Sequence, residues 1–194
     1  MLSSKIHQID FSSVLFDTLF GLVLYFSLDS FLEIQNPIHF VFYLFSIVIL
    51  IHWWLMFKSV DDMFDNEVTD SGMDIIIGII ELVLLDYLVL TSRSFDYMRT
   101  GWFLVALLLV DLLWTMIWRY VGTWRTADLQ KIKSMENELD RNLKALVIGL
   151  FLMSIFTILS PIVSPVIFVT GFMGSYIVYI ALTFRYKIID IKIF

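Results

Sequence analysis

Long apolar runs alternate with short polar connections along the chain. The hydrocarbon core of a bilayer is about 30 Å thick, so a helix that crosses it needs about 20 predominantly apolar residues. The apolar runs are far longer than the roughly ten residues of a membrane β-barrel strand. They predict an all-α, polytopic integral membrane protein with six transmembrane helices in a single domain. The six spans are Phe11–Glu33, Ile38–Phe57, Met73–Thr91, Gly101–Trp118, Leu143–Ser160 and Val163–Phe184.

The distribution of basic residues predicts the orientation of these spans, because cytoplasmic loops are enriched in Lys and Arg. With a cytoplasmic N-terminus, only Arg93 and Arg99 fall on the outer side. We therefore predict that both termini are cytoplasmic, in a prokaryotic plasma membrane. The basic residues on the cytoplasmic side are then Lys5, Lys58, Arg119, Arg125, Lys131, Lys133, Arg141, Lys144, Arg185, Lys187 and Lys192.

One cytoplasmic connection, residues 120–142, is much longer than the predicted outer loops. Its core, Thr126–Arg141, carries Leu129, Ile132, Met135 and Leu139 at helical spacing among charged residues. This pattern predicts an amphipathic helix that lies on the cytoplasmic membrane surface. The alternative is a solvated linker helix that has no binding partner.

Composition argues against a soluble domain, a nucleic-acid-binding protein and a metalloprotein. Hydrophobic residues make up 59% of the chain and charged residues 16%, against about 25% charged in a soluble domain. The net charge of −6 argues against nucleic acid as a partner, because such binding needs clustered Lys and Arg. There is no cysteine, and three histidines are scattered along the chain, so we expect neither a metal centre nor a cofactor.

Ionisable residues inside the predicted spans are the main candidate for function. They are Asp17, His52, Glu81, Asp86 and Asp111. A charge at the centre of a span costs about 2.5–3.5 kcal/mol on the insertion scale. Asp17 and His52 are at similar depth near the cytoplasmic side and form one potential pair, and Glu81 and Asp111 form another near mid-span. The residues either tie helices together through hydrogen bonds, worth about 0.6 kcal/mol each, or line an ion or proton path.

Two other patterns have simpler interpretations. Asp61, Asp62 and Asp65 match a DDxxD pattern that holds magnesium in prenyltransferases, but no second acidic motif or basic diphosphate site accompanies it. The signature of the CDP-alcohol phosphotransferases is absent too, and we expect that the protein is not an enzyme. Tryptophans at span ends, Trp53 and Trp54 among them, are predicted to be anchors at the membrane interface.

The first two spans carry a partial family motif. Phe11 and Ser12 match an Arg-x-x-x-Phe-Ser-Asp segment, although His7 and Ser13 replace its charged residues; Ser46 and Trp54 have the spacing of a second segment, in which Phe57 replaces a histidine. In these residues, and in its helix count, the chain resembles the potassium-channel family of transmembrane protein 175.

The resemblance implies a homo-oligomer whose central pore is lined by the first span, with bulky apolar residues forming the constriction. By position, the pore-lining residues are Thr18, Leu22 and Tyr25. The same helical face continues to Asp29, and a ring of Asp29 carboxylates would concentrate cations by electrostatic focusing.

Three functions are therefore considered. The first is a cation channel that forms a homo-oligomer in the lipid bilayer and conducts a monovalent cation, with potassium as the candidate ion. The second is a non-catalytic accessory subunit of a larger membrane complex. The third is a proton-coupled transporter of small solutes that uses Asp17 and His52, or Glu81 and Asp111.

Overall fold

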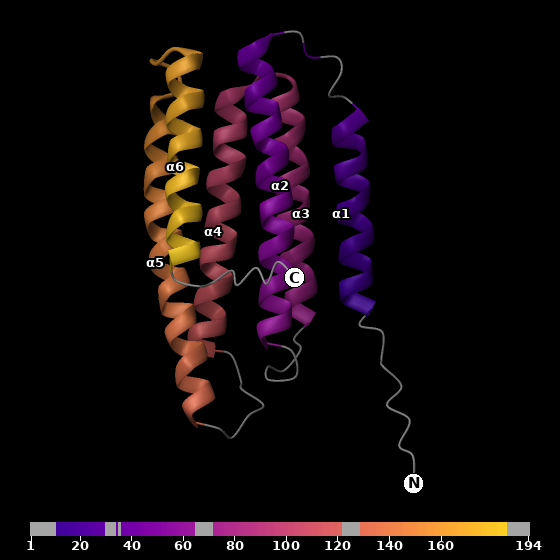
Figure 1. Ribbon diagram of the computed structural model, residues 1–194, viewed down its shortest axis with the longest axis vertical. Helices are drawn as coiled ribbons and strands as arrows, with labels where there is room; N and C mark the ends of the chain where they lie inside the picture. Colours follow the sequence, from indigo (N-terminus) through magenta and orange to yellow (C-terminus); the bar gives the residue numbers. More distant parts are fainter. Residues whose placement is uncertain (1–10, 30–33, 35, 65–71, 122–128, 186–194) are drawn as a thin grey trace.

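The computed structural model describes residues 11–29, 34, 36–64, 72–121 and 129–185, and in these residues it is all-helical, as predicted (Figure 1). Successive helices run in opposite directions along a common axis (Figure 1). Four of the helices are long and apolar enough to cross a membrane: α2, α4, α5 and α6. The helices are α1 (Phe11–Asp29), α2 (Pro37–Phe64), α3 (Gly72–Arg93), α4 (Tyr97–Val121), α5 (Leu129–Leu159) and α6 (Pro165–Arg185).

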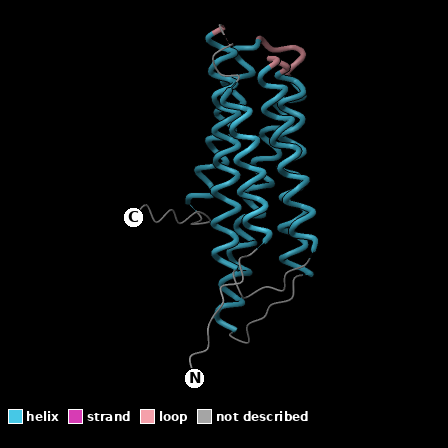
Figure 2. The backbone as a smooth tube through the Cα atoms, turned by 90° about the vertical axis from the view of Figure 1, so that its right-hand side faces the viewer, coloured by secondary structure: helices cyan, strands magenta, loops and turns pink. Residues whose placement is uncertain are grey.

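The connections 94–96 and 160–164 lie at the same end of the bundle, which we call the hairpin end (Figure 2). At this end, side-chain oxygens of Asn36, Asp96 and Ser164 accept hydrogen bonds from backbone N–H groups in the first turns of α2, α4 and α6. Pro37 and Pro165 occupy the first position of α2 and α6, where a missing N–H costs nothing. Local sequence thus sets where these three helices begin. The opposite end, where α2 and α4 end and α3 and α5 begin, is called the linker end.

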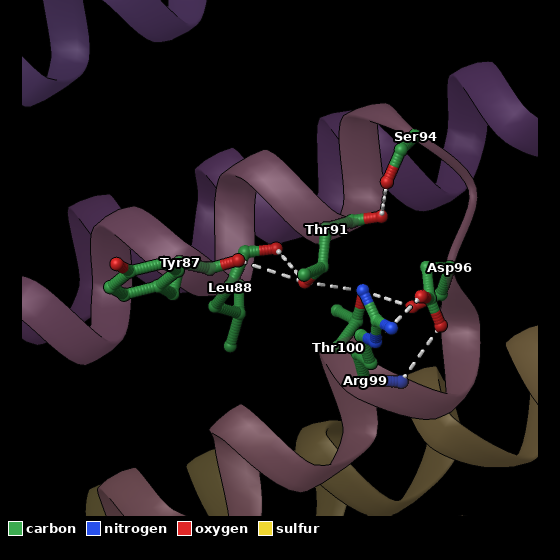
Figure 3. A network of polar contacts seen from close by, with 7 residues as sticks. All are labelled: Tyr87, Leu88, Thr91, Ser94, Asp96, Arg99 and Thr100. Carbon is green, nitrogen blue, oxygen red and sulfur yellow. Dashed lines mark hydrogen bonds and ion pairs between the residues drawn. The ribbon is translucent and has the colours of Figure 1, made fainter.

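The α3–α4 connection is a tight turn supported by polar contacts (Figure 3). Phe95 has a φ of 56°, a left-handed conformation that is uncommon for a residue with a bulky side chain. Asp96 pairs with Arg99 at 3.2 Å, and the Thr100 hydroxyl donates to Thr91 Oγ1 at 3.0 Å. The Thr100–Thr91 bond joins the end of α3 to the start of α4, and the Asp96–Arg99 pair supports the first turn of α4.

The helix α5 corrects the prediction for residues 120–142. From Leu129 the segment is helical, as predicted, but it continues without a break into the predicted fifth span and is not a separate helix. The helix has 31 residues, about 46 Å at 1.5 Å per residue, and extends beyond its neighbours at the linker end (Figure 1). Met135 and Leu139 are buried, whereas Leu129 is exposed, so the second half of the predicted apolar stripe packs against protein.

Helix α1 lies at one edge of the bundle, against α2 and α3 (Figure 1). Its Phe20 ring stacks on Trp54 of α2, with 5.3 Å between ring centroids. The Tyr43 hydroxyl of α2 donates to the backbone oxygen of Ser27, and Trp54 Nε1 donates to Asp17 Oδ1 at 3.0 Å. Aromatic side chains of α2 thus contribute to holding α1, which also packs against α3.

The hairpin half of the core is aromatic. The ring of Phe42 lies 5.9–6.2 Å from those of Phe95, Phe168 and Phe172, in edge-to-face contact with each. Phe45 contacts Phe172 in the same way. We call these five phenylalanines, contributed by α2, α6 and the α3–α4 turn, the aromatic cluster.

Candidate functional site

Polar side chains from five helices gather between the aromatic cluster and the linker end. Glu81, His52 and Thr115 are buried, and Asp111 and Asn142 are half-buried. Burial of this many polar groups from α2, α3, α4, α5 and α6 marks the candidate site. We call the set the polar cluster: His52, Trp53, Glu81, Asp111, Thr115, Asn142, Tyr176 and Tyr179.

Glu81 and Asp111 form the acidic part of the polar cluster. The two carboxyl groups, from α3 and α4, lie within electrostatic range of each other. Trp53 Nε1 donates to Glu81 Oε2 at 3.4 Å, and Thr115 Oγ1 donates to Asp111 Oδ1 at 3.5 Å. The hydrogen bonds of the pair in the described part of the chain therefore come from neutral donors and are long. We call these two residues the carboxyl pair.

His52 connects α2 to α6. Its Nδ1 lies 2.7 Å from the Tyr176 hydroxyl, and the two rings are perpendicular at 5.6 Å between centroids. The Tyr179 hydroxyl donates to Met56 Sδ at 3.7 Å. Tyr176 and Tyr179 are also in electrostatic range of Asp111, so the histidine side of the cluster is continuous with the carboxyl side.

The expected pairing of Asp17 with His52 is wrong. Asp17 accepts its hydrogen bond from Trp54 on the α1 side of α2, whereas His52 faces α6. His52 Nε2 has no hydrogen-bond partner among the described residues. Helical geometry explains the separation: residues 52 and 54 are about 200° apart around α2, so equal depth does not place them on the same face. Asp86 is half-buried on α3, and no hydrogen bond joins it to the polar cluster in the described part of the chain.

The predicted pore-lining residues lie on the outside of the bundle. Thr18 is exposed, and the exposed fractions of Leu22 and Tyr25 are 49% and 66%. These three residues form an exposed face of α1. The side chain of Asp29 lies outside the described residues.

The charged members of the polar cluster were predicted from the sequence, and the neutral members were not. Trp53 was expected to be an interface anchor but is buried and bonded to Glu81. Tyr176 and Tyr179 sit mid-span at a spacing of three residues, which places them on one helix face; that was the available signal. Thr115 and Asn142 carry no signal in sequence, because only the packing of α4 on α5 brings them together.

Two further observations define the chemistry of the site. Among the described residues, no group of three or more His, Asp and Glu side chains is placed to hold a metal ion. An open depression of about 310 Å³ lies away from the polar cluster, at the hairpin end, lined by Phe95, Asp96, Tyr97, Met98, Ser160 and Pro161. The polar cluster itself is a closely packed set of proton donors and acceptors around two carboxyl groups.

The chain was compared with models of known protein families, with curated proteins and with solved structures, and none of them matches it.

Proposed function

We propose that this protein translocates a proton or another small cation across a membrane, and that the carboxyl pair Glu81–Asp111 is the site that holds the cation. The observation that carries the proposal is the position of two mutually interacting carboxyl groups in the bundle interior, hydrogen-bonded only to neutral donors among the described residues. In this proposal the protein is a transporter and not an enzyme.

Electrostatics favours a cation at this position. Two negative charges close together in a medium of low dielectric repel strongly, and each one alone is costly at membrane depth. A single positive charge, as a shared proton or a bound cation, removes most of this cost. The site therefore favours a bound cation, which a path through the membrane must then deliver and remove.

Proton flux into liposomes tests this function. Purified protein is reconstituted, a membrane potential is imposed, and internal acidification is followed with a pH-sensitive dye. We expect Glu81→Gln and Asp111→Asn each to lower the flux about tenfold or more, which corresponds to about 1.4 kcal/mol in the barrier. Asp86→Asn is the matched control, because Asp86 is on the same helix as Glu81 but outside the polar cluster, and it should leave the flux unchanged. Folded wild-type protein that gives no more flux than empty liposomes would falsify the proposal.

A second candidate is the cation channel implied by the resemblance to the transmembrane protein 175 family. The exposed α1 face of Thr18, Leu22 and Tyr25 supports it, since a pore built from first spans needs such a face in each subunit. Potassium flux that falls on substitution of Leu22, together with a cross-linked oligomer through α1, would favour the channel. A stable monomer would exclude it, and stoichiometric co-purification with other proteins would favour an accessory subunit.

The six-span topology with cytoplasmic termini is part of the same proposal. Because the chain contains no cysteine, single cysteines can report sidedness without a background signal. Lys133 and Arg99 are exposed at opposite ends of the bundle. In intact cells, an impermeant maleimide should label Arg99→Cys and not Lys133→Cys; the reverse pattern would invert the orientation.

A further inference from the structure

A line of hydrogen-bonding side chains leads from the carboxyl pair toward the linker end. Thr115 Oγ1 lies between Asp111 Oδ1, at 3.5 Å, and Asn142 Nδ2, at 3.1 Å. Glu138 lies one turn before Asn142 on α5, on the same side of the helix and closer to its start. There, Glu138 Oε1 pairs with Arg141, which is exposed, at 2.8 Å. Hydrogen bonds join Asp111, Thr115 and Asn142, and Glu138 extends this polar line by one helical turn toward the start of α5.

Two buried polar atoms of this line have no hydrogen-bond partner among the described residues: Asn142 Oδ1 and Glu138 Oε2. Buried polar atoms in proteins are nearly always satisfied by protein groups or by ordered water. A buried water makes about three hydrogen bonds to such otherwise unsatisfied groups. Asn142 and Glu138 therefore present two acceptors that ordered water would satisfy.

The opposite direction from the carboxyl pair is closed by apolar packing. The aromatic cluster and the buried side chains of Leu88, Leu104 and Leu108 fill the hairpin half. Buried hydroxyls in this half, such as those of Ser46 and Thr157, donate to carbonyl oxygens of their own helix. No described chain of side-chain hydrogen bonds runs from the carboxyl pair through this half of the bundle.

We propose that Asn142 and Glu138 hold ordered water that connects the aqueous phase at the linker end to Asp111, so that the carboxyl pair exchanges protons from that end alone. The proposal rests on the proposed function for its biological role and specifies its substrate as the proton. Asn142 and Thr115 act as positioning residues: they hold the water molecules along which protons move, while Asp111 accepts the proton and shares it with Glu81.

Hydrogen exchange of the carboxyl groups tests the path without relying on transport. Infrared spectra of the reconstituted protein are recorded after a change from H₂O to D₂O, and the C=O band of the protonated carboxyl pair is followed as it shifts on deuteration. The band is assigned to the carboxyl pair by its absence from the spectra of Glu81→Gln and Asp111→Asn. We expect Asn142→Leu, which removes both polar atoms at similar volume, to slow this exchange about tenfold, the rate equivalent of one hydrogen bond.

Two more variants keep the test decisive. Thr115→Val removes the bridging hydroxyl at nearly constant volume and should also slow the exchange, which covers the case in which Asn142→Leu fails to fold. Asn137→Leu is the matched control, because Asn137 is exposed on the same helix, and it should exchange at the wild-type rate. Exchange in Asn142→Leu and Thr115→Val at the wild-type rate overturns the path.

Flux measurements separate this inference from the proposed function. If flux depends on Glu81 and Asp111 but Asn142→Leu and Thr115→Val transport and exchange normally, the transport proposal stands and the water path is wrong. If the wild type carries no flux but its carboxyl exchange slows in both variants, the path stands and the transport proposal fails.

Discussion

In the hairpin half of the bundle, the hydroxyls of Ser46 and Thr157 donate to the carbonyl oxygens of Phe42 and Met153, four residues earlier in their own helices. Toward the linker end, by contrast, the side chains of His52, Trp53 and Asn142 each bond to a side chain of another helix. The hairpin half has polar bonds between helices too, made by Thr100, Tyr43 and His39, but its core is held mainly by the packing of aromatic rings. The core toward the linker end is held by polar bonds between helices.

The two halves show which kind of contact suits which task in a membrane. Lipid tails are as apolar as the core, so helices in a bilayer associate through close packing and interhelical hydrogen bonds. Interlocking rings maximise packing and leave no polar route, whereas interhelical polar bonds are worth only about 0.6 kcal/mol each but place exchangeable protons in the interior. Stability should therefore depend mainly on the aromatic cluster, and function on the polar cluster.

The largest loss of stability is expected from Phe42→Ala. Phe42 is fully buried and contacts three other rings, so truncation leaves a large cavity. We expect about 3 kcal/mol of destabilisation, the low end of the range for such truncations, because the lipid offers an alternative apolar environment in the unfolded state. Thermal unfolding in detergent, followed by tryptophan fluorescence, measures it. Leu44→Ala on the exposed face of α2 is the control, and equal losses for both would contradict a packed aromatic half.

Glycine substitutions test the packing of the same half by adding side-chain volume, whereas Phe42→Ala removes it. A Cβ on Gly171 would overlap the ring of Phe156 of α5, whereas a Cβ on Gly174, one turn later in α6, has open space. We expect Gly171→Ala to destabilise by about 1–3 kcal/mol through overpacking. Gly174→Ala should be neutral or stabilising by up to about 1 kcal/mol, since alanine favours a helix. The two variants make the same chemical change and differ only in location. Equal unfolding temperatures for both would show that the α5–α6 interface is loosely packed.

Much of the fold was predictable because hydrophobic run length reports helices directly. The bounds of α2, α3, α4 and α6 follow the predicted spans to within a few residues, apart from an extension of α2 to Phe64. The start of α5 was placed wrongly because the charged segment before Asn142 has an amphipathic pattern that fits a surface helix as well as a helix packed on α4. Only the tertiary contact between α4 and α5 distinguishes the two.

The site was predictable only in part, for a similar reason. Glu81 and Asp111 stand out because a charged residue in an apolar run is expensive, and depth alone placed them together. For Asp17 and His52, equal depth in the membrane did not predict contact, because the sequence does not show which way each side chain faces around α1 and α2. Neutral residues such as Tyr176 and Asn142 do not carry the free-energy cost of a charge in an apolar span, so they do not stand out in the sequence. Their hydrogen bonds can be recognised only in the assembled bundle.

A polar bond toward the linker end should matter less for stability than the aromatic packing. Tyr176→Phe removes the hydroxyl that lies 2.7 Å from His52 Nδ1 and keeps the ring. We expect a loss of about 1 kcal/mol, because one buried hydrogen bond is lost and the imidazole nitrogen is left unpaired. The same unfolding assay measures it, with Tyr87→Phe as control, since Tyr87 is exposed. A loss as large as that of Phe42→Ala would erase the distinction between the two halves.

The smallest effect is expected at the linker end itself, where Arg119 of α4 reaches across to α5. Its Nε lies 2.7 Å from Asp140 Oδ1, its Nη1 lies 3.2 Å from Glu136 Oε1, and the two acidic side chains are 41% and 37% exposed. Such accessible pairs are worth little, so Arg119→Gln should cost about 0.5 kcal/mol. Salt screens exposed charges, with a Debye length of about 3 Å at 1 M, so the difference from wild type should shrink in 1 M salt. Lys133→Gln, at an exposed position of α5, serves as the control. A difference from wild type that persists in high salt would mean that Arg119 fixes α5 through packing, and that the linker end is held by shape as the hairpin end is.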